Sequence, residues 1–298
     1  MSNTYLRDYK NNNGIVIEEA KVNKLKKENN AWKVAFTKNH KKNLITAKNI
    51  ILSAGTINTP LILRKSGISK LAGKYFQMHP TVKVVALFKD KINTENMGVP
   101  VHQVKEFDSK FSFGCSISSK PYLRIAMLDH YSDIGIVEER WGNMAIYYSA
   151  IIPSGFGKII ELPFFNDPLI NYHLTKTDKF NLSDGLKKLC QLLLKAGAYS
   201  IYPSIKGSSI ISNESDIDKI PKYLNPSKTS LMTVHLFSSC PIGENRNFCV
   251  ADSYGKIFDH NGLFISDGSM LPSAPGVNPQ GAIMALASRN IKKIIAEA

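Results

Sequence analysis

Three stretches near the N-terminus alternate apolar and polar positions, which is the pattern of a half-buried β-strand. They cover residues 14–25, 31–38 and 42–55, and the polar run KKENN separates the first two. The third stretch closes with the apolar run NIILSA and the small pair Ala54-Gly55. We therefore expect a small sheet, followed by a strand whose buried end leads into a tight turn.

The residues after this turn have the boundary signals of a helix. Thr59 is expected as the N-cap, Pro60 at the first helical position and Gly67 as the stop. A strand, a small-residue turn and a helix start are typical of α/β proteins. Such a turn presents backbone N–H groups to a ligand at the C-terminal end of the strand.

From residue 81 the pattern changes to short apolar strands separated by turns, at residues 82–88, 111–118, 143–152 and 157–162. This spacing predicts a largely antiparallel sheet. Residues 181–198 then show helical periodicity with Gly197 as the stop, and one face carries Leu182, Leu186, Leu189 and Leu193. A last strand is expected at 231–237, whereas the polar residues 1–13 are expected to be frayed or extended.

Composition narrows the class of protein. Apolar residues make up 43% of the chain and charged residues 21%, which is ordinary globular usage. The net charge of +14 raises nucleic acid or anionic lipid as partners, but no arginine-rich stripe is present, so lysines on solvated faces are favoured. Four scattered cysteines form no metal motif and fit a reducing, cytoplasmic location, and the N-terminus has no apolar signal region.

Candidate chemistry gathers in the last quarter of the chain. His235 ends an apolar run, and taken alone a histidine there is more often a satisfied core residue. Asn278 and Pro279 precede an apolar-periodic helix, where they suit either an ordinary helix start or an anion site at the positive end of the helix dipole. Asp267-Gly268 and Ala54-Gly55 are by themselves ordinary turns.

Three ordered segments carry a resemblance to a known family: HLFSSCPIG (235–243), GLFISDGSMLP (262–272) and GVNP (276–279). They resemble the C-terminal signature of the glucose–methanol–choline family of flavin-dependent oxidoreductases, in its cholesterol-oxidase and long-chain alcohol-oxidase branch. Residues 49–68, followed by 71–80, are similar to the second signature of that family. The resemblance spans roughly residues 14–298, and its C-terminal block is the most specific part.

The resemblance implies FAD as cofactor and oxidation of an alcohol by hydride transfer to flavin N5. It implies that His235 acts as the base and that Asn278 orients the hydroxyl, while His79 is interpreted as structural. The cofactor-binding residues that it implies are Ala54, Gly55, Asp267, Gly268, Asn278, Pro279 and Gln280. The apolar middle of the chain suggests an apolar alcohol, such as a long-chain alcohol or a sterol.

Two departures from the family pattern qualify this expectation. No GxGxxG turn occurs in the sequence, so an N-terminal flavin-binding portion is expected to be absent and the chain to be incompetent without a complementing N-terminal flavin-domain chain. In the His motif, Ser238 and Ser239 stand where the family has glycines, and they could crowd the backbone approach to the flavin ring.

The expected fold class is therefore α/β plus α+β. A partial FAD-binding, Rossmann-like domain lacking its N-terminal dinucleotide-binding unit covers residues 1–80, and a substrate domain built on an antiparallel sheet flanked by helices covers 81–230. Residues 231–298 return to the FAD-binding domain with the active-site motifs. The alternative left open is a non-catalytic remnant, or a binding module that uses its basic surface on anionic lipid.

Overall fold

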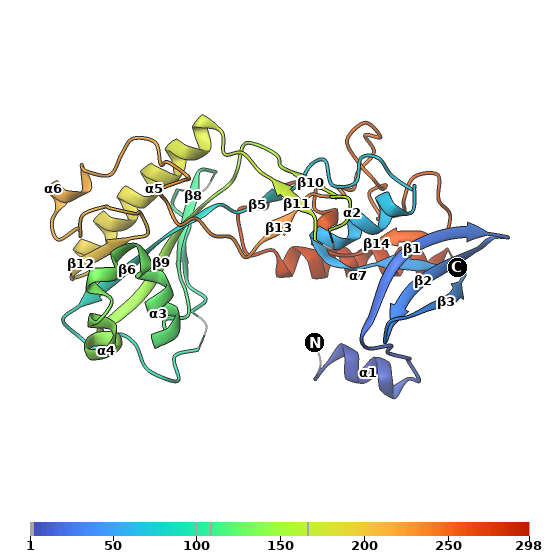
Figure 1. Cartoon of the computed structure of the whole chain (residues 1–298), viewed down its shortest axis with the longest axis horizontal. Helices are drawn as coiled ribbons and strands as arrows, with labels where there is room; N and C mark the ends of the chain where they lie inside the picture. The colour runs from blue at the N-terminus through green and yellow to red at the C-terminus, as the bar shows by residue number, and fades with distance from the viewer. Residues whose placement is uncertain (1–2, 99, 108, 166, 298) are drawn as a thin grey trace.

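The computed structural model describes residues 3–98, 100–107, 109–165 and 167–297. Two bodies lie end to end along the long axis (Figure 1). One holds the N-terminal strands together with helices α2 (Gly55–Lys65) and α7 (Gln280–Ala296), and the other holds a five-stranded sheet with helix α5 (Lys176–Lys195). Between them, β5 (Gln77–Met78) pairs antiparallel with β13 (Leu236–Phe237), so two segments far apart in sequence meet where the bodies join.

The first sheet is antiparallel in the order β1-β2-β3, with β1 at Ala20–Glu28, β2 at Ala31–Lys38 and β3 at Lys41–Ala47. The alternation expected for β2 is confirmed, because Trp32, Val34 and Phe36 are buried between partly exposed neighbours. The N-terminal expectation is wrong in one respect. Instead of an extended segment, the described residues form helix α1 (Tyr5–Asn11), whose seven residues are all exposed; Met1 and Ser2 lie outside the described residues.

A parallel strand pair and a helix form the α/β part of this body. β4 (Ile50–Leu52) pairs with β14 (Leu263–Ile265), and α2 follows β4 directly. Helix α2 begins at Gly55, five residues earlier than the sequence signals indicated, because its cap comes from a distant segment. The Asp267 carboxylate accepts from the Gly55 N–H at 2.9 Å and from the Thr59 hydroxyl at 2.6 Å.

Pro60 consequently lies inside α2 rather than at its start. A proline has no N–H, so the carbonyl of Thr56, four residues earlier, lacks its helical donor. The Ser239 hydroxyl donates to that carbonyl at 2.6 Å, and the Thr56 hydroxyl in turn donates to the Leu236 carbonyl at 2.9 Å. The start of α2 is thus hydrogen-bonded to the segment that follows His235.

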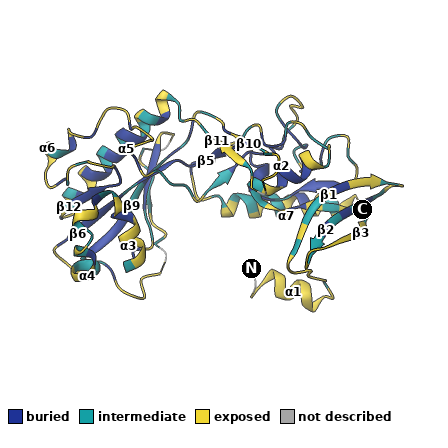
Figure 2. Ribbon diagram, in the orientation of Figure 1, coloured by how far each residue is buried: buried dark blue, intermediate teal, exposed yellow. Residues whose placement is uncertain are grey.

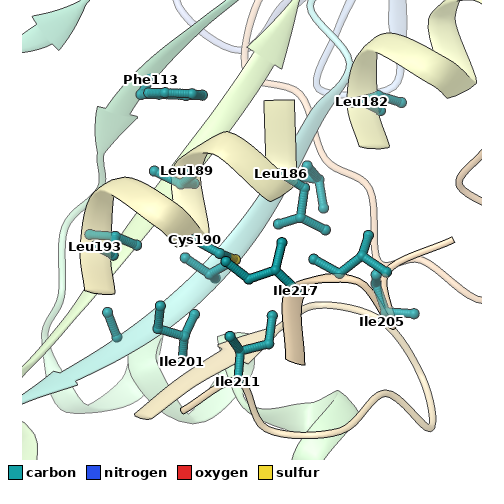
Figure 3. Packing of buried hydrophobic residues seen from close by; sticks show 14 of the residues in the cluster. Phe113, Leu182, Leu186, Leu189, Cys190, Leu193, Ile201, Ile205, Ile211 and Ile217 are labelled. Atoms are coloured by element: carbon teal, nitrogen blue, oxygen red, sulfur yellow. The ribbon is translucent and has the colours of Figure 1, made fainter. Parts of the chain in front are cut away.

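The second body is built on the predicted antiparallel sheet. Its strand order is β12-β6-β9-β8-β7, and the strands are β6 (Thr81–Phe88), β7 (Gln103–Val104), β8 (Phe111–Cys115), β9 (Met144–Ile151) and β12 (Ala198–Pro203). Helix α5 packs on one face of this sheet (Figure 3). Helices α3 (Lys120–Ala126) and α4 (Ile136–Arg140) pack on the other face.

The leucine face predicted for α5 is confirmed: Leu182, Leu186, Leu189 and Leu193 are all buried against the sheet (Figure 3). The helix starts at Lys176, earlier than its apolar pattern indicated. The reason is a capping box, in which the Thr175 hydroxyl accepts from the Asp178 N–H and the Asp178 carboxylate accepts from the Thr175 N–H. Gly197, with φ +94°, follows the end of the helix as expected.

The remaining elements are short apart from α7. β10 (Lys158–Ile160) pairs with β11 (Leu169–Asn171), and α6 spans Glu214–Ile217. The 3₁₀ turns lie at Leu128–Asp133, Trp141–Asn143 and Gly268–Met270. The strand expected at 231–237 is reduced to β13, and α7 lies on the surface with partly exposed residues along most of its length (Figure 2).

Asp267 offers a direct test of this packing. Replacing Asp267 by Ala removes the acceptor for the Gly55 and Ser269 N–H groups and for the Thr59 hydroxyl, in a site that is only 8% exposed. We expect the free energy of unfolding to fall by about 3 kcal/mol, because buried donors lose their partner. Urea unfolding of the flavin-free chain measures it.

The matched control is Asp259→Ala. Asp259 pairs with Arg246 on the surface, so this change should cost less than about 1 kcal/mol. Equal losses in the two variants would contradict the capping role of Asp267.

Candidate functional site

His235 and Asn278 line the same pocket, at the junction of the two bodies. The pocket encloses about 680 Å³ of empty space, counted to its open mouth. Its polar wall also includes His79, Lys83, Gln103, Ser112, Ser116 and Tyr148. Its apolar wall includes Phe111, Ala150, Ile151, Ile152, Met232 and Val234. Six separate segments of the chain therefore converge on one cavity.

The two histidines of the pocket contact each other directly. Nδ1 of His79 lies 3.3 Å from Nδ1 of His235, and the His79 N–H donates to the His235 carbonyl at 3.2 Å. The two rings are nearly perpendicular, and the His79 ring also packs edge-on against Phe237 at 4.8 Å between centroids. His79 is 5% exposed, whereas His235 is half-buried. The buried ring of His79 thus packs against the half-buried ring of His235.

The side chains of Gln77 and His79 also hold the loop that leads to Asn278. Gln77 Oε1 accepts from the Ala274 N–H at 2.9 Å, and His79 Nε2 accepts from the Gly276 N–H at 3.2 Å. Residues two apart in an extended segment face the same side, which explains the regular spacing of these bonds. On the other side of the loop, Lys105 Nζ donates to the Gly276 carbonyl at 2.6 Å.

Burial keeps both histidines neutral near pH 7. It lowers the pKa of His79 to about 4, with further contributions from His235 and from the Lys105 cation. Burial also lowers the pKa of His235.

Asn278 does not cap α7, contrary to one interpretation of its sequence position. The N-cap residue is Pro279, and no described side chain caps this helix. The Asn278 amide oxygen accepts instead from Gln103 Nε2 at 3.4 Å, and the same nitrogen lies 3.4 Å from the Tyr148 hydroxyl. Gln103 and Tyr148 come from the sheet of the other body, so no local sequence signal could have identified them.

The structure also brings together the turns expected to bind the cofactor. Ala54 is exposed, and a Cβ on Gly55, which has φ +82°, would meet no atom within 4 Å. Asp267 is used internally, since its carboxylate bonds to the chain. Gly268 is closely packed, because an added Cβ would lie 3.1 Å from the Leu236 carbonyl oxygen.

At the start of α7, Asn278 and Gln280 are exposed and Pro279 is half-buried, so this helix end is open to solvent.

The two serines that replace family glycines are accommodated in the interior. Both are 0% exposed. The Ser239 hydroxyl donates to the Thr56 carbonyl and the Ser238 hydroxyl to the Pro272 carbonyl, at 2.6 and 2.9 Å. Ser238 keeps the glycine-like conformation of the motif, with φ 61°. Their side chains are therefore directed into hydrogen bonds within the chain.

Comparison with known proteins defines the class. A family model described as GMC oxidoreductase matches residues 1–81, and a second model with the same description matches residues 165–287. An uncharacterized GMC-type oxidoreductase of Sinorhizobium fredii is 37% identical over 80% of this chain and 48% of its own length. A long-chain-alcohol oxidase of Arabidopsis thaliana is 25% identical over 95% of this chain and 42% of its own length.

Two solved structures share the fold. Pyridoxine 4-oxidase from Mesorbium loti superposes with a TM-score of 0.67 at 16% identity, covering 92% of this chain and 57% of that protein. An FAD-dependent oxidoreductase from Chaetomium thermophilum gives a TM-score of 0.68 at 15% identity, covering 99% of this chain and 64% of that one.

These similarities place the chain among oxidoreductases of mixed α/β fold. The chain belongs to the GMC oxidoreductase family, which confirms the resemblance found in its sequence motifs. It spans about half the length of the curated relatives it matches. Across the described residues, no helix has the length and apolar character needed to cross a membrane.

The buried histidine predicts an acid-dependent loss of stability. His79 has a pKa of about 4 in the folded chain and 6.5 as its ordinary value, so between these values only the unfolded chain binds the proton. The free energy of unfolding should therefore fall as the pH decreases from about 6.5 to about 4, by roughly 3 kcal/mol, and this contribution should level off below.

His79→Gln supplies the comparison for this prediction, because it removes the titrating group and leaves every other group in place. The difference in unfolding free energy between the two proteins should change by about 2 to 3 kcal/mol from pH 7.5 to pH 4.5. Parallel pH profiles would contradict the assignment of a buried neutral imidazole.

Proposed function

We propose that this protein takes part in the FAD-dependent oxidation of an alcohol, with His235 and Asn278 as the residues that hold the reacting hydroxyl. The observation that carries the proposal is their position on one pocket, although they come from two separate segments. Family membership supports the reaction class. The names of two similar proteins, a long-chain-alcohol oxidase and pyridoxine 4-oxidase, support an alcohol as the substrate.

The open backbone surfaces around the pocket fit a flavin. Ala54 and Gly55 follow β4, one of two parallel strands, and the carboxyl end of such strands is where α/β folds bind nucleotides. The open Cβ position at Gly55 leaves room for a group to approach the backbone. The uncapped start of α7, at Pro279 and Gln280, offers the positive end of a helix dipole to an anionic group.

The chemistry follows from the groups in the pocket. When bound, FAD supplies at N5 the acceptor for a hydride from the carbinol carbon. The amide oxygen of Asn278 accepts a hydrogen bond from the hydroxyl and so fixes the oxygen. The hydroxyl proton passes to His235 Nε2 if that nitrogen is free of hydrogen, and to water in the pocket otherwise. His235 therefore acts as a base if its hydrogen lies on Nδ1, and as a hydrogen-bond donor if its hydrogen lies on Nε2.

The substrate class that we propose is an apolar alcohol. The pocket is lined in part by the apolar side chains of Phe111, Ile151 and Met232. A second pocket, with about 1300 Å³ of empty space, lies between α5 and the sheet edge. Gln103 lines both pockets, and the second is walled by apolar side chains that include Phe113, Leu189 and Leu193. An alkyl chain attached to the hydroxyl carbon can be accommodated there.

We also propose that the flavin and the substrate are bound by different parts of the chain, as expected from the sequence. Residues 1–80 and 231–298 hold the flavin, and residues 81–230 hold the substrate. The five-stranded sheet begins at Thr81, and its core with α5 draws on residues between Val82 and Leu231. The α2–β14 core draws on residues between Val22 and Ala72 and between Cys240 and Leu286. Each body thus has its own core, which supports separate binding tasks.

The test uses a complex of this chain with a complementing flavin-domain chain that carries a GxGxxG turn, because this sequence contains no such turn. FAD is titrated into the complex, and binding is followed by quenching of flavin fluorescence. A series of primary alcohols of increasing chain length is then added without oxygen. We expect loss of the yellow absorbance with alcohols, and faster loss with longer chains. An FAD-saturated complex that no alcohol bleaches would contradict the proposal, and so would a complex with the complementing chain that binds no FAD.

His235→Ala and Asn278→Ala should each slow this bleaching by about a hundredfold or more, because each removes a group that holds or exchanges the hydroxyl proton. The matched controls are His173→Ala and Asn11→Ala, which change exposed residues away from the pocket. If bleaching were slowed equally in the controls, His235 and Asn278 would have no special part. FAD affinity is measured in every variant to separate binding from reaction.

A further inference from the structure

We propose that His79 is a positioning residue that fixes the tautomer of His235, holding the hydrogen of His235 on Nε2. His235 then meets the pocket as a hydrogen-bond donor. This assignment comes from an ordered series of three groups: the Gly276 N–H, the His79 ring and the His235 ring. Its consequence for the alcohol rests on the function proposed above, whereas the tautomer itself is a property of the chain alone.

The series starts from a group whose direction is fixed. A backbone N–H can only donate, so Nε2 of His79, 3.2 Å from the Gly276 nitrogen, must present its lone pair. A neutral imidazole carries one hydrogen, so the hydrogen of His79 lies on Nδ1. The loop cannot easily withdraw this N–H, because Lys105 holds the Gly276 carbonyl and Gln77 holds the Ala274 N–H.

The position of the hydrogen on His79 determines the position of the hydrogen on His235. Nδ1 of His79 lies 3.3 Å from Nδ1 of His235, so the hydrogen on the first nitrogen is donated to the lone pair of the second. His235 in its neutral form therefore carries its hydrogen on Nε2. Among the residues that the structure describes, Nε2 of His235 has no hydrogen-bond partner, so this N–H remains available to a ligand.

The two alternative states of His235 each break this series. Both the other neutral tautomer and the imidazolium place a hydrogen on Nδ1 of His235. Nδ1 of His79 would then have to accept, and its own hydrogen would move to Nε2, directly opposite the Gly276 N–H. A buried donor without an acceptor is unfavourable, so the Nε2–H tautomer should predominate by at least several-fold.

The consequence at the hydroxyl is an ordered pair of hydrogen bonds. The alcohol oxygen accepts from Nε2–H of His235, and its hydrogen is donated to the Asn278 amide oxygen. With its hydrogen on Nε2, His235 would not take the hydroxyl proton, and its N–H would instead stabilise the partial negative charge that develops on oxygen as that proton leaves to solvent. Gly276 sets the tautomer of His235, and Asn278 orients the hydroxyl. Both residues belong to one loop, so a change in this loop would alter the tautomer and the hydroxyl orientation together.

The test is ¹⁵N NMR of the flavin-free chain labelled at histidine, recorded near pH 7.5. Imidazole nitrogens with and without hydrogen have well-separated shifts, and His79→Gln and His235→Gln identify the signals of each ring. We expect His235 protonated at Nε2 and His79 protonated at Nδ1. A wild-type spectrum with His235 protonated at Nδ1 would overturn the proposal, even if the chain proves to oxidise alcohols. Absence of alcohol oxidation would leave the tautomer result intact.

Two variants separate positioning from simple packing. His79→Leu fills the site without hydrogen bonds, and it should turn His235 into a mixture of both tautomers. His79→Gln can accept from Gly276 and donate to His235 through its amide, so it should keep the Nε2–H form. An unchanged His235 spectrum in the leucine variant would overturn the proposal. If that variant fails to fold, the wild-type signals of His79 and His235 still decide.

Discussion

The site depends on the hydrogen bonds that the side chains of Gln77 and His79 accept from the backbone N–H groups of Ala274 and Gly276. The short strand β5 pairs with the segment after His235 through its backbone. Gln77 in this strand and His79 just beyond it hold the Asn278 loop through their side chains, so residues 77–79 contact both segments of the site. Because these groups are buried, the loss of either hydrogen bond would leave an unpartnered donor, which costs free energy of folding.

How much of this could be predicted depends on how local the physical cause is. The alternation in β2 and the leucine face of α5 are written into consecutive residues, and both are confirmed. The start of α2 could not be found in the same way, because its cap, Asp267, lies 212 residues along the chain from Gly55. The local signals at Thr59 and Pro60 were genuine helix-boundary residues, but the distant carboxylate moved the boundary.

The functional site shows the same difference between features with a local cause and features with a distant one. His235 and Asn278 stood out through motifs, and the structure places both on one pocket. The partners that orient them did not stand out. Gln103 reaches Asn278 from the edge strand of the other body, and His79 was interpreted as structural although its ring contacts that of His235. The direction of the hydrogen bond between the His79 and His235 rings depends on the group that contacts the other nitrogen of His79. That group is the backbone N–H of Gly276, which lies in a third segment.

The proline inside α2 makes two distant sequence positions interdependent. At Pro60 the helix gives up a donor, and the Ser239 hydroxyl replaces it at the Thr56 carbonyl. A serine at 239 is therefore favourable in this chain because position 60 is a proline, and a glycine at 239 would suit a residue with its own N–H at position 60. The two positions are therefore expected to be energetically coupled, so that replacing either residue changes the effect of replacing the other.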